Sequence, residues 1–94
     1  MAQKTIGKGI TSHYVYILQS KDGKFYTGYT TDLARRMKQH KNGKGAKFTR
    51  SFGFRKLLYH ERLATRSAAL KREAAIKTLT RLEKKGLFSK TDPC

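Results

Sequence analysis

The chain has 94 residues, a mass of 10.8 kDa and a formal net charge of +16, from 22 Lys and Arg against 6 Asp and Glu. That length allows one small domain, and a hydrophobic fraction of 37% with five Tyr and five Phe excludes a wholly disordered chain. The longest apolar run, 14–18, is far shorter than the roughly 20 residues of a membrane span, so we expect no membrane partner.

Two features of the chain ends bear on its cellular setting. The single cysteine, Cys94, excludes a disulfide framework and a cysteine zinc site within one chain. Residues 1–12 lack the apolar run of a signal peptide and are expected to form a flexible basic arm. We therefore expect a cytoplasmic protein, and no obligate protein partner is evident from the sequence.

The first folded element is predicted to be a β-hairpin. Residues 14–19 and 25–30 are rich in aromatic and β-branched residues, and a turn signal at 21–24 separates them. A three-residue loop over 21–23 would pair Tyr16 with Gly28 and place Tyr16 and Tyr26 on one face. The two-residue alternative, 22–23, would pair Tyr16 with Tyr29 and separate the two tyrosines. We predict the longer loop, because Gly23 tolerates its left-handed last position and Gly28 leaves space for a ring.

A helix is expected next, over about 32–41, capped by Thr31 or Asp32 and stopped by Asn42-Gly43. Four of its residues share one face at helical spacing: Leu33, Arg36, Met37 and His40. Residues 44–53 are predicted to form a basic, glycine-containing loop, and residues 54–63 a third strand.

The C-terminal part is predicted to be helical. Thr65 is a suitable N-cap for an alanine-rich helix over about 66–79. The apolar stripe of that helix comprises Ala68, Ala69, Ala75, Ile76 and Leu79. Thr80 and Glu83 match a capping box, which indicates a short last helix ending near Gly86, followed by a frayed tail at 90–94. The chain is therefore expected to fold as one α+β domain over 13–89, a small three-stranded antiparallel sheet flanked by helices in the order β-β-α-β-α-α.

Positive charge is concentrated in the middle of the chain. The segment 33–60 contains no acidic residue, and it carries Arg35, Arg36, Lys38, Lys41, Lys44, Lys47, Arg50, Arg55 and Lys56. A long stretch of one sign is typical of a surface that faces nucleic-acid phosphates. Phe48, Phe52 and Phe54 lie within it and could stack on bases, although at least two of them are expected to anchor the core or a loop.

Two neighbouring tyrosines such as Tyr16 and Tyr26 usually pack on a sheet without a chemical role. The motifs that contain them favour a functional role instead. Tyr14-Val15-Tyr16, followed after nine residues by Tyr26-Thr27-Gly28, resembles the two-part signature of the GIY-YIG nuclease superfamily. Arg36 stands ten residues after Tyr26, His40 follows one helical turn later, and Glu73 lies on the second predicted helix. The match extends over most of the chain and is most similar to the small stand-alone bacterial branch.

This resemblance implies an endonuclease that hydrolyses phosphodiester bonds with a divalent metal, Mg²⁺ or Mn²⁺, on DNA in preference to RNA. Glu73 would be the metal ligand, although pairing with Lys77 at i+4 is a plainer alternative. Arg36 would bind the scissile phosphate. Tyr16 and Tyr26 would line the site, and the general base could be Tyr16, Tyr26 or His40. A free phenol has a pKa near 10 and needs help, whereas histidine titrates near neutrality.

Six basic residues are expected to track the nucleic-acid backbone without reading its sequence: Arg35, Lys38, Lys41, Lys44, Lys47 and Arg50. A second hypothesis keeps the fold and the nucleic acid but not the chemistry, and makes the protein a non-catalytic binding module for DNA or structured RNA. Retention of the motif tyrosines, the arginine and the glutamate favours the enzyme.

Overall fold

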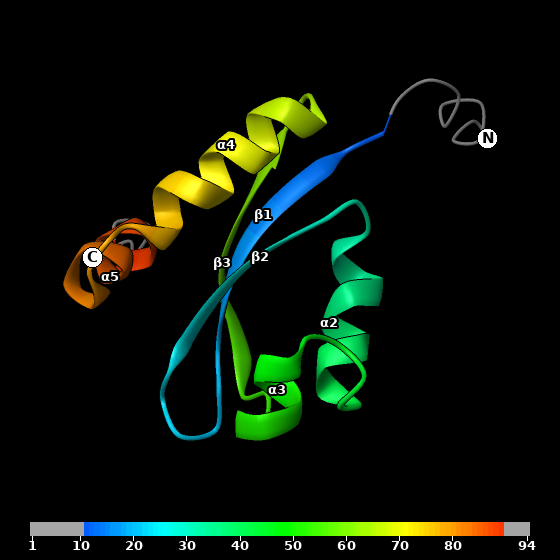
Figure 1. Cartoon of the computed structure of the whole chain (residues 1–94), viewed down its shortest axis with the longest axis vertical. Coiled ribbons are helices and arrows are strands. Elements are labelled where there is room, and N and C mark those ends of the chain that lie inside the picture. Colours follow the sequence, from blue (N-terminus) through cyan, green and yellow to red (C-terminus); the bar gives the residue numbers. More distant parts are fainter. Residues whose placement is uncertain (1–10, 90–94) are drawn as a thin grey trace.

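The computed structural model describes residues 11–89, so the expected arm and tail, at 1–10 and 90–94, lie outside the described residues. Its elements are β1 (His13–Gln19), β2 (Phe25–Thr30), α2 (Leu33–Lys41), α3 (Lys47–Phe52), β3 (Lys56–Leu63), α4 (Arg66–Lys77) and α5 (Arg81–Ser89). The strands form one antiparallel sheet in the order β2-β1-β3, which confirms the predicted α+β class (Figure 1). Over the described range, no helix combines the length and apolar character needed to cross a membrane.

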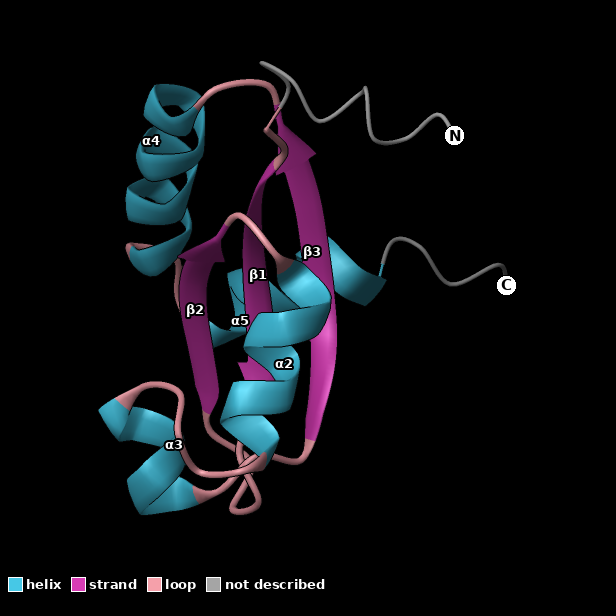
Figure 2. Cartoon of the chain, turned by 90° about the vertical axis from the view of Figure 1, so that its right-hand side faces the viewer, coloured by secondary structure: helices cyan, strands magenta, loops and turns pink. Residues whose placement is uncertain are grey.

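The central strand β1 is covered on both faces. Four consecutive side chains, Val15 to Leu18, are fully buried. Figure 1 shows α4 and α2 on opposite sides of the sheet, and Figure 2 shows α2 in front of the strands with α5 behind them. Val15 and Ile17 pack with Ala69 and Ile76 of α4 in the hydrophobic core. Tyr16 points to the other face, toward α2, because side chains alternate along a strand.

The β1–β2 hairpin has the predicted three-residue loop. Tyr16 pairs with Gly28 and Leu18 with Tyr26, and Gly23 adopts the left-handed φ of 89° that this loop requires. The ring of Tyr16 lies over Gly28, across the edge strand β2. Tyr16 and Tyr26 therefore share one face, with ring centroids 6.3 Å apart.

The β1–β3 pairing contains a bulge. Ile17 pairs with Tyr59 but Leu18 pairs with Leu57, which leaves Leu58 as an extra residue in β3. Leu58 and Tyr59, although adjacent in sequence, both pack against the hydrophobic core. The bulge explains this arrangement, because an unpaired residue interrupts the strict alternation of a strand.

The helix ends follow the predicted capping residues. Asp32, not Thr31, caps α2 by accepting from the Arg35 N–H, and Thr65 caps α4 by accepting from the Ala68 N–H. The capping box is confirmed, with Thr80 N donating to Glu83 and Glu83 N donating to Thr80. Helix α4 stops at Lys77, before the predicted end at residue 79, and α5 continues past Gly86 to Ser89. Of the predicted α4 stripe, Ala69 and Ile76 are buried, Leu79 is half-buried, and Ala68 and Ala75 are exposed.

The prediction of a loop over 44–53 was wrong, because residues 47–52 form the short helix α3. No side chain caps this helix, and six residues are too few for a helix to be stable alone. Tertiary contacts hold it in place instead. Phe48 stacks on Tyr26, Thr49 is buried, and the Phe52 carbonyl accepts from the Lys21 N–H of the hairpin loop.

Replacing Gly28 with Ala should destabilise the protein by about 1–3 kcal/mol, the usual cost of overpacking. A Cβ at this position would lie 2.5 Å from the Tyr16 hydroxyl oxygen and 2.9 Å from Tyr26. Urea denaturation measures the loss. Gly86→Ala is the matched control, since its Cβ would meet nothing within 4 Å and a helical alanine should stabilise by about 0.5–1 kcal/mol. Equal effects of the two substitutions would contradict the close approach at Gly28.

Candidate active site

A buried hydrogen bond joins the sheet to α2. The Tyr16 hydroxyl lies 2.8 Å from Nε2 of His40, and the exposed fractions of the two residues are 0% and 1%. Tyr16 is presented by the central strand, and the helical spacing of α2 places His40 one turn after Arg36 on the face that meets the sheet. Two residues that are 24 positions apart in the chain thus form one polar pair.

Thr49 of α3 fixes the direction of this pair. Its hydroxyl donates to the Ala46 carbonyl oxygen at 3.1 Å and lies 2.8 Å from Nδ1 of His40. Because the threonine proton is already used, Nδ1–H of His40 must donate to Thr49. Nε2 then carries the lone pair and accepts from Tyr16. The order of donation is Tyr16 to His40 to Thr49 to the Ala46 carbonyl, with His40 neutral.

Burial shifts both titrating groups of this chain toward their neutral forms. Burial, followed by the charge of Arg36, lowers the pKa of His40 to about 4. Burial likewise raises the pKa of Tyr16 to about 12; the interaction with Arg36 lowers it, and the nearby Tyr26 and Glu73 add smaller increases. His40 is therefore neutral at pH 7 and can accept a hydrogen bond at Nε2, while Tyr16 keeps its proton.

Aromatic rings enclose the pair. The Tyr26 ring lies 5.7 Å from the His40 ring between centroids, and Phe48 stacks on Tyr26 at 5.1 Å. Phe54 stacks on His40 at 6.5 Å. Phe48 and Phe54 thus anchor this layer, as expected for at least two of the three phenylalanines, and Phe52 is 41% exposed.

Arg36 connects the phenol to an open cavity. Its Nη1 donates a hydrogen bond to Oε1 of Gln39 at 3.0 Å. The side chains of Arg36 and Arg35 line a cavity of about 300 Å³ between α2 and the end of β2. Within residues 11–89, Arg36 Nε and Thr27 Oγ1 are the two buried side-chain polar atoms without a hydrogen-bond partner. A buried guanidinium N–H is costly without an acceptor, so this nitrogen is suited to an oxygen of a ligand.

Glu73 approaches from the helix on the opposite face of the sheet. Its side chain is 19% exposed and forms an ion pair with Lys77 at 3.3 Å, which is the plainer interaction the sequence suggested. Its charge nevertheless acts on the pKa of Tyr16, whose ring lies across the edge strand. The structure thus brings Tyr16, Tyr26, Arg36 and His40 together, and places Glu73 within electrostatic range of Tyr16.

The residues expected to track a nucleic-acid backbone are all exposed. They come from the outer side of α2, the following turn and α3, and comprise Arg35, Lys38, Lys41, Lys44, Lys47 and Arg50. The position missed by sequence reasoning is Thr49. Thr49 contacts His40 because it lies on α3, and no capping residue in the sequence indicates that helix. The sequence therefore contains no local signal for the role of Thr49.

Known proteins resemble this chain in sequence and in structure. The model of the GIY-YIG catalytic domain matches residues 12–86. A UPF0213 protein of Staphylococcus saprophyticus is 48% identical over 77 residues, which cover 82% of this chain and 94% of that protein. The solution structure of a UPF0213 protein from Bacillus halodurans matches with 49% identity, 83% coverage of both chains and a TM-score of 0.53. The solution structure of a protein from E. faecalis matches with 44% identity, 85% coverage of both chains and a TM-score of 0.57.

The free energy of unfolding should fall by about 2 kcal/mol between pH 7 and about 5, because of His40. Its pKa is about 4 when folded against 6.5 as a free group, so between these values the unfolded chain binds the extra proton. The stabilisation is complete above pH 6.5 and is lost as the pH falls toward 4. Urea denaturation across this range should show a much flatter profile for His40→Gln.

His60→Gln is the control for this titration, because His60 lies on β3 and is exposed. It should keep the pH profile of the parent protein. If His40→Gln also kept that profile, the neutral, buried state of His40 would be disproved.

Proposed function

The chain belongs to the GIY-YIG catalytic domain family, and from that premise we propose that it is a metal-dependent endonuclease acting on DNA. Family membership supports a nuclease fold and a nucleic-acid substrate; the hydrolysis of DNA by this chain is our proposal. The observation that carries it is Arg36, whose buried Nε has no partner and whose side chain both lines an open cavity and influences Tyr16. A phosphodiester oxygen in that cavity would accept a hydrogen bond from the guanidinium of Arg36.

Arg36 would hold the scissile phosphate beside Tyr16. Its planar guanidinium can donate two hydrogen bonds to one phosphate, which both orients the group and offsets charge that develops during hydrolysis. The neighbouring Arg35 lines the same cavity and adds positive charge at its rim. The phosphate would thus lie between two guanidinium groups, in a cavity that Tyr29 and Asp32 also line.

Tyr16 and His40 would then move a proton. The Tyr16 hydroxyl donates to Nε2 of His40 and is fully buried, so the attacking water would reach its oxygen only when Arg36 turns from the phenol to the phosphate. As that water loses a proton to the phenol oxygen, the phenol proton would pass to Nε2. Burial and Arg36 disfavour the imidazolium that results, and the negative charge of the bound phosphate would offset this cost. Thr49 holds the imidazole in the tautomer that can accept the proton. We therefore assign the general base to Tyr16 acting with His40, and a lining role to Tyr26.

Glu73 would hold the divalent cation, Mg²⁺ or Mn²⁺. Within residues 11–89 no group of three or more His, Cys, Asp or Glu side chains is placed to bind a metal ion. One carboxylate is nevertheless enough for Mg²⁺, which commonly keeps several waters and accepts phosphate oxygens of the substrate. The carboxylate of Glu73 is mostly buried, with a single lysine as its ion-pair partner. A bound cation would supply positive charge to the phosphate and to the leaving oxygen.

Replacing Glu73 with Ala should abolish metal-dependent cleavage while DNA binding survives. The measurement is cleavage of labelled single-stranded and double-stranded DNA with Mg²⁺ or Mn²⁺, with and without a chelator. Glu83→Gln, a carboxylate substitution that preserves the capping box, should cut like the parent protein. If the Glu73→Ala protein still cleaved DNA, Glu73 would not be the metal ligand. A parent protein that binds DNA but never cuts it would support the non-catalytic binding module instead.

Binding should also weaken steeply with salt, by roughly a thousandfold between 50 and 200 mM, because contacts to phosphates release counterions. Removing two contacts with Lys47→Gln and Arg50→Gln should reduce the slope of the logarithmic salt plot by about 2. The matched control replaces the exposed Arg66 and Lys71 of α4 with Gln and should leave the slope unchanged. Identical slopes for the two double variants would exclude α3 as part of the nucleic-acid interface.

A further inference from the structure

A second hollow, of about 330 Å³, lies at the edge of the sheet, beside β2. It is formed where the hairpin meets α3 and α5, and Figure 1 shows the hairpin end between these two helices. Two aromatic rings and three cationic side chains line it: Phe25, Phe48, Lys24, Arg81 and Lys84. None of the roles derived above uses this combination of residues.

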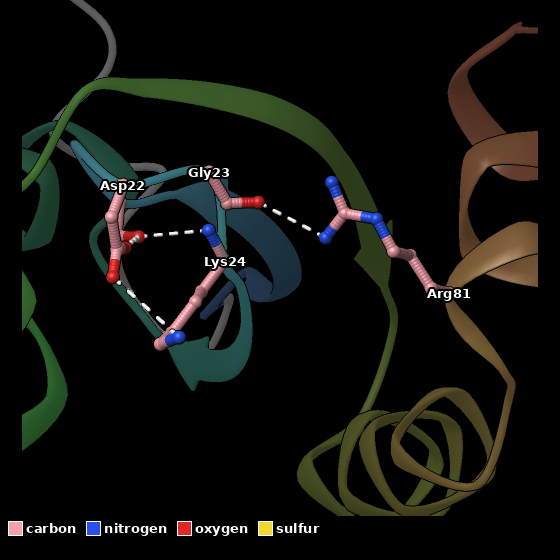
Figure 3. A network of polar contacts seen from close by, with 5 residues as sticks. Asp22, Gly23, Lys24 and Arg81 are labelled. Carbon is pink, nitrogen blue, oxygen red and sulfur yellow. Dashed lines mark hydrogen bonds and ion pairs between the residues drawn. The ribbon is translucent and has the colours of Figure 1, made fainter.

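Arg81 is held in place by the hairpin. Its Nη1 donates to the Gly23 carbonyl oxygen at 3.0 Å, and its guanidinium lies 4.2 Å from the centre of the Phe25 ring. Figure 3 shows the side chain reaching from α5 toward the loop. A cation that is already ordered loses little conformational entropy when a ligand binds, so Arg81 is suited to a binding role.

The other two cations are open to a ligand. Lys24 lies 5.1 Å from the centre of the Phe52 ring and forms an ion pair with Asp22 at 3.5 Å. Both charged side chains are about half exposed, at 51% and 49%, so the ion pair contributes little. Lys84 is half-buried at the hollow. No carboxylate is among the lining residues, and Glu83 of the same helix turn caps α5 through the Thr80 N–H. The hollow therefore presents net positive charge.

Phe48 links the hollow to the candidate active site. It lines the hollow, stacks on Tyr26 with centroids 5.1 Å apart, and contacts the tilted ring of Phe52 at the same distance. Tyr26 in turn contacts the rings of Tyr16 and His40. A ligand in contact with Phe48 would therefore be separated from Tyr16 and His40 by the rings of Phe48 and Tyr26.

We propose that this hollow binds an unpaired nucleotide next to the cleaved phosphodiester, and therefore that the substrate is single-stranded at that position. The proposal rests on the proposed nuclease function and names its substrate class. Aromatic rings beside cations are the combination by which proteins bind single strands, since a base stacks on the ring while its phosphate meets the cation. A base-paired duplex keeps its base faces stacked inside and offers none to Phe48.

The test measures binding without cleavage, in chelator, with a short fluorescein-labelled oligothymidylate. Lys84→Glu should weaken binding about tenfold, because it places a negative charge at the phosphates. Lys85→Glu is the matched control, since Lys85 is exposed, does not line the hollow and changes the net charge equally. It should weaken binding less than about threefold. Equal losses in the two variants would overturn the proposal.

A second measurement uses the unaltered protein and so does not depend on the folding of a variant. The parent should bind an oligonucleotide of the same length and charge that lacks its bases about tenfold more weakly than oligothymidylate. It should also prefer the single strand to a blunt duplex of equal length. Equal affinity for the three ligands would overturn the nucleotide site. Because no metal is present, that outcome would leave the cleavage test of Glu73 unaffected.

Discussion

The hydrogen bond between Tyr16 and His40 is the interaction on which this face of the protein depends. Both side chains are fully buried and both are neutral, so losing either partner would leave a polar atom without water or protein to satisfy it. The bond fixes α2 against the central strand, and the bond from His40 to Thr49 fixes α3 against α2. The packing of one layer and the proton path of the candidate site are therefore the same set of contacts.

The two faces of the sheet are stabilised differently. The face toward α4 is apolar around Val15 and Ile17, although α4 itself contributes mainly small side chains. A polar cluster also holds α4 against the sheet. Arg72 of α4 donates to Glu61 of β3 at 2.8 Å, and the Tyr59 hydroxyl donates to the same carboxylate. Separating the apolar core from the polar aromatic layer lets a small domain hold buried titratable groups without weakening its core.

The parts of the fold that follow local rules could be predicted from the sequence. The hairpin register followed from Gly23 and Gly28, and three helix starts followed from capping side chains such as Thr65. Helix α3 has no such cap and is held by contacts with distant residues, so it was read as a loop. Thr49 was missed for the same reason. The i+4 pairing of Glu73 with Lys77 is visible in the sequence, whereas the electrostatic reach of Glu73 to Tyr16 depends on how the helix packs.

The bulge at Leu58 affects how the molecule behaves among its own copies. β3 is an outer strand of the sheet, and an outer strand offers unpaired backbone groups to any neighbouring chain. Here the strand is interrupted by the bulge and carries exposed Lys56, His60 and Arg62. A strand kinked by a bulge and bordered by exposed Lys56 and Arg62 is a poor template for intermolecular β-pairing, so this edge of the sheet disfavours fibrillar association.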